Sequence, residues 1–204
     1  MSTVHMMRQV LAKPLDFFYD LKEPNRLKWS QAILLILLAY LVRMGSLLML
    51  GYHFETREPY EISYFHEFIW IFIPWITWCL ANWSVSTILD GEGKFKELFV
   101  GSAFCLVPYI VFTIPVTVLT NILALSEGIY YSASIVIVLG WVALLMLIKV
   151  RVLHDFELGK LIMITFLTVL GMAIIWFIGI LLYGLVNQFI SFFLDIFKEL
   201  RFRL

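Results

Sequence analysis

Five long runs of apolar residues alternate with short polar segments along this chain of 204 residues. The apolar runs lie at residues 29–50, 65–89, 99–124, 129–148 and 161–182. A helix of about 20 apolar residues crosses the hydrocarbon core of a bilayer, and each run is long enough or nearly so. The pattern therefore predicts an all-α integral membrane protein whose five transmembrane helices occupy residues 29–183.

The two ends of the chain show apolar residues at helical spacing with charged residues between them. In residues 1–28, Pro14 starts or kinks a helix, and the cluster Phe17, Phe18 and Tyr19 is unusual for a frayed polar tail. Residues 184–204 form either a second amphipathic helix or a continuation of the fifth span. We expect amphipathic helices at the membrane interface at both ends.

Composition supports a membrane protein and excludes several other classes. The chain is 62% hydrophobic and 15% charged, with a mean hydropathy of +0.92, whereas soluble domains are about half apolar and a quarter charged. Zero net charge gives no indication of a nucleic-acid partner. Cys79 and Cys105 lie inside apolar runs, without the spacing of a disulfide framework or zinc site, and we interpret them as buried free thiols.

Motifs of catalysis and of cofactor binding are missing from the sequence. The segment around Glu92 has neither the alternating oxygen ligands of a calcium loop nor the lysine and hydroxyl of a phosphate loop. His66 and Glu67 begin a zinc-protease pattern, but Trp70 stands where its second histidine is required. We predict no catalytic residue, no cofactor and no metal.

Basic residues predict the orientation of the chain in the membrane. The segments before the first span, between the second and third spans, and between the fourth and fifth spans carry most of the lysines and arginines, namely Arg8, Lys13, Lys22, Arg26, Lys28, Lys94, Lys96, Lys149, Arg151 and Lys160. The positive-inside rule then places the N-terminus in the cytoplasm, with the chain crossing the cell membrane several times. In the last of these segments, His154 and Asp155 are interpreted as a surface pair.

The hairpin between the second and third spans holds most of the unusual residues. Asn82 lies inside the membrane, where its amide needs a partner, and Gly91 and Gly93 permit the positive φ of a tight turn. Pro108 and Pro115 share a helix face, and each frees a backbone carbonyl. These features indicate either a polar cavity or merely a kinked, well-packed helix.

A single charge interrupts the first span. Arg43 lies about 21 Å along that helix, nearer its far end. It either extends its charge to the interface or pairs with an acid, for which Glu67 and Glu127 are the candidates.

A series of short motifs resembles the bacterial branch of the Yip (Ypt-interacting protein) domain family over roughly residues 10–190. The motifs, in chain order, are Pro14-Leu15-Asp16, Asn82-Trp83, Leu89-Asp90-Gly91-Glu92-Gly93, Phe95-Lys96, Leu106-Val107-Pro108, Pro115, Leu119-Thr120-Asn121, His154 and Lys160. Phe104 and Thr120 depart from the tyrosine and serine of the family pattern.

The resemblance implies a five-span protein with a cytoplasmic N-terminus and no enzymatic activity. Eukaryotic relatives bind small GTPases and help to shape membranes, and bacterial relatives are often encoded beside sugar ABC importers. We therefore expect a membrane accessory or scaffold protein, with a carbohydrate ABC permease as its partner. The alternative is a small transporter or lipid-handling protein with a polar cavity around Asn82 and the proline-broken third span.

Overall fold

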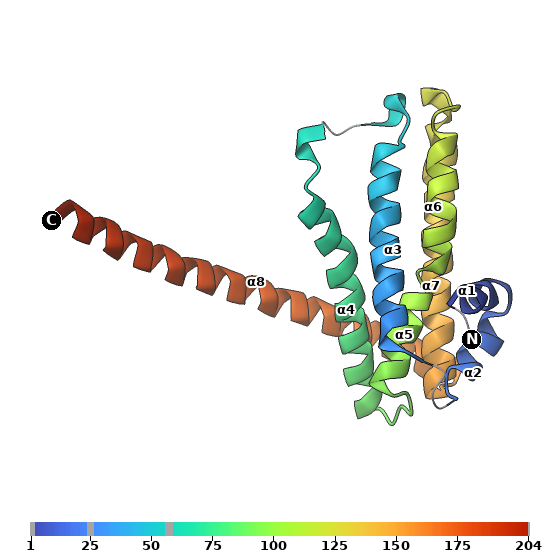
Figure 1. Ribbon diagram of the computed structural model, residues 1–204. Helices are drawn as coiled ribbons and strands as arrows, with labels where there is room; N and C mark the ends of the chain where they lie inside the picture. The colour runs from blue at the N-terminus through green and yellow to red at the C-terminus, as the bar shows by residue number, and fades with distance from the viewer. Residues whose placement is uncertain (1–2, 24–26, 56–58, 204) are drawn as a thin grey trace.

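The computed structural model describes residues 3–23, 27–55 and 59–203, and the regular structure of these residues is helical (Figure 1). The membrane-length helices are α3 (Trp29–Leu48), α4 (Tyr64–Ile88), α7 (Gly128–His154) and α8 (Leu158–Arg203), and the third span is formed by α5 (Phe95–Phe104) followed by α6 (Val107–Leu119). Within the described residues, five helical segments are long and apolar enough to cross a membrane, which confirms the predicted all-α, five-span fold.

Two of the predicted spans have different ends in the structure. The third span begins at Phe95, because Lys94 precedes the first helical turn and Glu97 accepts a hydrogen bond from its backbone N–H. The fourth continues to His154, where Asp155 turns the backbone into the left-handed region with φ 55°. We predicted Lys149 in the polar segment between the fourth and fifth spans, and that prediction is wrong because Lys149 lies within α7.

The N-terminal segment folds as two helices, α1 (Thr3–Ala12) and α2 (Pro14–Asp20). Pro14 starts α2, where its missing N–H costs nothing and its fixed φ suits the first turn. The apolar sides of both helices are turned inward, and Met6, Phe17 and Phe18 are at most 1% exposed. These helices pack on α6 and α7, so much of their apolar surface is covered by the protein itself. Their contact with a membrane surface stays a prediction.

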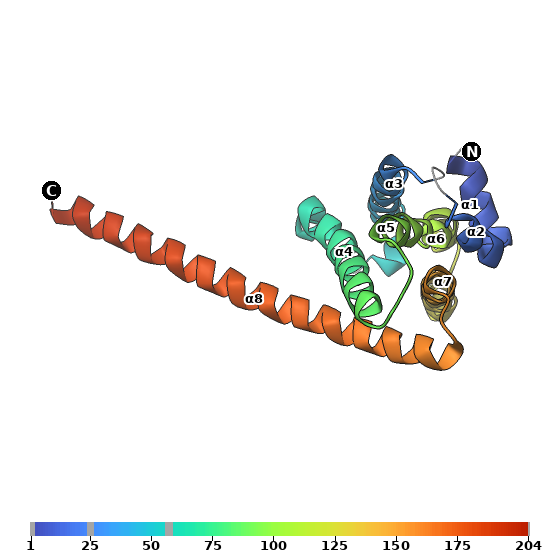
Figure 2. The ribbon, with the colours of Figure 1, turned by 90° about the horizontal axis from the view of Figure 1, so that it is seen from below.

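Four of the spans stand side by side, and the fifth crosses them (Figure 1). The α4–α5 turn, the α7–α8 turn and the N-terminal helices lie toward one end of this bundle, and the α3–α4 connection lies at the other (Figure 1). Helix α8 packs against α4 and α7, and the view from below shows it passing both and projecting far beyond α4 (Figure 2).

Helix α8 runs without interruption from Leu158 to Arg203. Residues 184–204 were predicted as either a separate amphipathic helix or a continuation of the fifth span, and the described residues up to Arg203 continue the fifth helix. Their position at a membrane interface stays a prediction.

Candidate functional site

The turn between α4 and α5 is shaped by an aspartate. Asp90 adopts a left-handed backbone with φ 59°, and the N–H of Gly91 donates to the carbonyl of Ser86 at 2.8 Å. This bond closes the end of α4 in the manner of a Schellman motif, in which glycine is the usual left-handed residue. We expected positive φ at Gly91 and Gly93, and that expectation is wrong, because neither glycine has it.

The two glycines are required instead by the close approach of His154. A Cβ atom on Gly91 would lie 2.5 Å from His154 Nδ1, and one on Gly93 would lie 2.8 Å from His154 Cε1. The N–H of Gly93 donates to His154 Nδ1 at 3.2 Å. Because Nδ1 accepts this bond, the neutral ring carries its proton on Nε2. The imidazole thus holds the turn against the end of α7.

His154 is in turn held by the residues that follow it. Its ring is 2% exposed and stacks on Phe156, with ring centroids 5.1 Å apart and an interplanar angle of 9°. Lys160 places its ammonium 4.7 Å from the centroid of the Phe156 ring. The interpretation of His154 and Asp155 as a surface pair is wrong, because the histidine is buried beneath the turn whereas Asp155 is exposed. Tertiary structure therefore brings together residues about 60 positions apart.

Aromatic residues of the same hairpin form a second contact beside the turn. The ring of Phe95 lies 5.5 Å from that of Trp83 and 6.2 Å from that of Trp29, measured between centroids. Phe95 thereby joins the start of α5 to α4 and to the start of α3. Lys96 is half-buried on the next position of α5.

Asn82 is fully buried between α4 and α8. Its side-chain Nδ2 donates to Thr168 Oγ1 at 3.3 Å, and its Oδ1 has no hydrogen-bond partner within the described residues. Neither of the two clefts described below is lined by Asn82, Pro108 or Pro115. The geometry therefore ties Asn82 to helix packing and gives no support to a transport cavity around it.

The two prolines of the third span act differently. Pro108 occupies the first turn of α6, and the backbone leaves regular α-helix between Phe104 and Val107. Pro115 lies inside α6, which continues past it to Leu119. Only Pro108 therefore coincides with an interruption of the helix.

The far end of the third span is tied to the end of the first. Asn121 Nδ2 donates to the carbonyl of Met49 at 3.0 Å, and the N–H of Gly51 donates to Thr120 Oγ1 at 2.8 Å. A Cβ on Gly51 would lie 2.5 Å from the Thr120 carbonyl oxygen, so the two backbones approach closely here. Thr120, which departs from the serine of the family pattern, still accepts this bond through its hydroxyl.

A buried lysine lies near the C-terminal end of α7 and was missed from the sequence. Lys149 is 0% exposed, its Nζ donates to Ser102 Oγ at 2.7 Å, and it lies 5.8 Å from the centroid of the Trp78 ring. Its position directly after the fourth apolar run could have indicated that the helix continues through it. Helix α7 continues through that position and turns the side chain inward.

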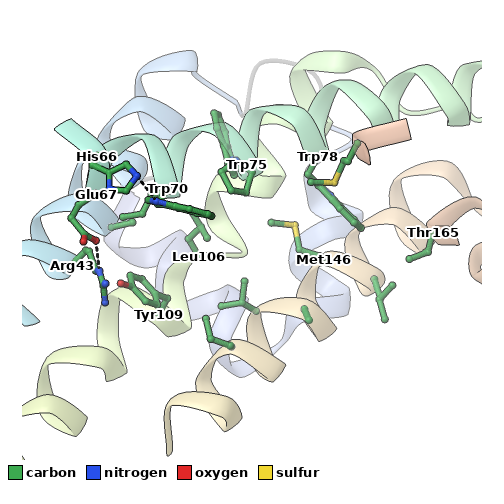
Figure 3. Close-up of a pocket in the computed structure, with 18 of the residues that line it drawn as sticks. Arg43, His66, Glu67, Trp70, Trp75, Trp78, Leu106, Tyr109, Met146 and Thr165 are labelled. Atoms are coloured by element: carbon green, nitrogen blue, oxygen red, sulfur yellow. Dashed lines mark hydrogen bonds and ion pairs between the residues drawn. The ribbon is translucent and has the colours of Figure 1, made fainter. Parts of the chain in front are cut away.

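Arg43 pairs with Glu67, one of its two predicted partners. Arg43 Nε lies 2.8 Å from Glu67 Oε2, and the Glu67 side chain is 6% exposed (Figure 3). The pair lies at one end of a large cleft of about 1140 Å³. The cleft is lined by residues of α3, α4, α6, α7 and α8, including Arg43, His66, Trp70, Pro74, Trp75, Trp78, Leu106, Tyr109, Ala143, Met146, Thr165 and Met172.

The geometry of a metal centre is not found in the described part of the chain. No group of three or more histidine, cysteine, aspartate or glutamate side chains there is arranged to hold a metal ion. Cys79 and Cys105 are buried free thiols, as predicted.

Comparison with known proteins identifies the family. The chain has no match among the curated proteins or among the solved structures. The model of the Yip1 domain matches residues 8–181, which span all of the motifs of the predicted resemblance. With five membrane-length helices among its described residues, the chain belongs to the Yip1 domain family and is a multi-pass membrane protein.

Proposed function

We propose that this protein is a non-enzymatic accessory or scaffold protein of the membrane that packs against another membrane protein through the distal α8 segment, residues 177–199. Every residue of this segment is exposed, and apolar side chains surround the helix on all sides as far as Leu194, before the charged residues Asp195, Lys198 and Glu199. A helix that is apolar all round is normally buried by protein or lipid. The chain itself leaves this segment uncovered (Figure 2).

Two features of the distal α8 segment favour a protein partner over lipid alone. Gly179 and Gly184 have open space where a side chain would be, and small residues allow helices to approach closely in membranes. Asn187 and Gln188 expose their amide side chains in the same stretch. In hydrocarbon, such amides are stabilised by hydrogen bonds across a helix interface, worth about 0.6–2 kcal/mol each.

The partner we propose is the permease of a carbohydrate ABC importer. The support is the resemblance of the motifs to the bacterial branch of the family, whose members are often encoded beside such importers.

We further propose that the protein lies in the cell membrane with its N-terminus in the cytoplasm. The N-terminal helices, the α4–α5 turn and the α7–α8 turn lie toward the same end of the bundle, and most of the basic residues lie in or next to these elements in the sequence (Figure 1).

The test compares substitutions at two glycines, at each of which an added Cβ would meet no atom within 4 Å. Gly184→Phe places a ring on the distal α8 segment, and Gly140→Phe places one on the exposed part of α7. We expect Gly184→Phe to reduce co-purification of the importer in mild detergent and Gly140→Phe to leave it unchanged. Equal recovery with both variants, or a wild-type chain isolated without any permease, would refute the proposal.

A further inference from the structure

The large cleft opens within the membrane-spanning part of the fold, between α4 and α7 (Figure 3). Its volume of about 1140 Å³ exceeds the range of about 300–1,000 Å³ that is common for small-molecule sites. Trp70, Pro74, Trp75 and Trp78 of α4 form one wall, and aliphatic residues of α7 form the other. Walls of this composition are chemically suited to hydrocarbon chains.

One end of the cleft is polar. Arg43 uses its Nε for Glu67, and its two terminal nitrogens have no hydrogen-bond partner within the described residues. Tyr109 lines the cleft beside this pair, and the Trp70 indole donates to His66 Nε2 at 2.9 Å. Figure 3 shows Tyr109 directed toward the Arg43–Glu67 pair.

A smaller pocket of about 160 Å³ continues the polar end. It shares Arg43 with the large cleft and adds Ser46, Glu55 and Tyr131. Glu61, five residues before His66 in the chain, also lines the large cleft. Among the described residues, one guanidinium thus faces two exposed carboxylates in addition to its buried partner. This charge distribution suits a headgroup with both a negative and a positive charge.

We propose that the cleft binds one phospholipid with a zwitterionic headgroup. The phosphate accepts hydrogen bonds from the free guanidinium nitrogens of Arg43, which are geometrically suited to phosphate oxygens. The ammonium lies toward Glu55 and Glu61, and the acyl chains follow the tryptophan wall. Glu67 and Trp78 are separated by roughly 16 Å along α4, a length that accommodates much of an acyl chain. The inference uses no residue of the distal α8 segment and is independent of the proposed accessory function.

The experiment measures lipid retention by native mass spectrometry. The protein is exchanged into detergent with phosphatidylethanolamine or phosphatidylglycerol of equal chain length. We expect one phosphatidylethanolamine to remain bound, at an affinity about tenfold above that of phosphatidylglycerol, since one charge-assisted contact is worth about that factor. The double variant Arg43→Gln/Glu67→Gln removes both charges of the pair together, and it should abolish the preference between the two lipids.

Two tryptophan insertions separate binding in the cleft from binding elsewhere. Ala143→Trp fills the cleft from α7, whereas Ala133→Trp adds the same ring at an exposed position of α7 outside it. We expect only Ala143→Trp to release the lipid. Three results would overturn the proposal: no lipid retained by the wild type, equal retention by both insertions, or a dimer that Ala143→Trp dissociates, which would show that the cleft holds a second copy of the chain.

Discussion

Gly93 contacts His154, which lies 61 positions later in the chain. Whether the substitution Gly93→Ala stabilises or destabilises the protein should therefore depend on His154. A Cβ on Gly93 would lie 2.8 Å from His154 Cε1, 3.1 Å from Nδ1 and 3.2 Å from Nε2, and all three atoms belong to the same imidazole. That ring is buried and stacked on Phe156. Overpacking at such a site costs about 1–3 kcal/mol, so Gly93→Ala should lower the free energy of unfolding by that amount.

The same substitution should have the opposite sign when the imidazole is absent. Gly93 does not have positive φ, so alanine fits its backbone. In the His154→Ala background, Gly93→Ala should therefore raise stability by about 0.4–1 kcal/mol, because alanine loses less backbone entropy on folding. Thermal unfolding of the four proteins in detergent, followed by tryptophan fluorescence, forms the double-mutant cycle.

The control for the cycle is Gly140→Ala, at a helical position with open space. It should stabilise the protein by up to about 1 kcal/mol with His154 present or absent. If Gly93→Ala destabilises equally in both backgrounds, the contact with His154 is not the reason for the glycine, and our account of the turn fails.

Three further predictions follow from the buried and surface polar residues. Lys149→Met, which keeps the length of the side chain and removes a buried amino group that is hydrogen-bonded to Ser102, should be neutral or raise stability by about 1–3 kcal/mol; a melting temperature well below that of the wild type would contradict this. Thr120→Val should lower stability by about 1–3 kcal/mol, because the buried N–H of Gly51 loses its acceptor, whereas Thr120→Ser should retain the bond. Equal losses of stability in the two variants would show that this hydrogen bond is not the cause. A cysteine at exposed Glu92 should react with a membrane-impermeant maleimide only from the cytoplasmic side, and one at exposed Tyr60 only from outside; the reverse pattern would overturn the orientation.

Helix content and the number of spans followed from composition along the chain. Apolar runs of about 20 residues have only one stable form in hydrocarbon, where each backbone N–H and C=O must be paired within the segment. The ends of the helices were harder to predict from the sequence, because they depend on capping. The fourth span continued through Lys149 to His154, where Asp155 took the left-handed conformation.

Individual site residues were predicted with mixed success. The pairing of Arg43 with Glu67 was one of the alternatives that the sequence left open, beside pairing with Glu127 or extension to the interface, and the structure shows the Glu67 pair. Gly91 and Gly93 were assigned to the turn, but the reason offered was backbone freedom. The reason in the structure is the imidazole of His154, whose position depends on how α7 packs against the hairpin.

The sequence by itself determined that this chain forms apolar helices of membrane length, because local composition decides whether a segment is stable in hydrocarbon. It also marked the residues of the α4–α5 turn as unusual. Only the tertiary structure decided that His154 lies under that turn, that Lys149 is buried beside Ser102, and that α4 and α7 enclose a cleft with Arg43 at its end. Those contacts join residues far apart in the chain, and they arise from the packing of whole helices, which no local pattern encodes.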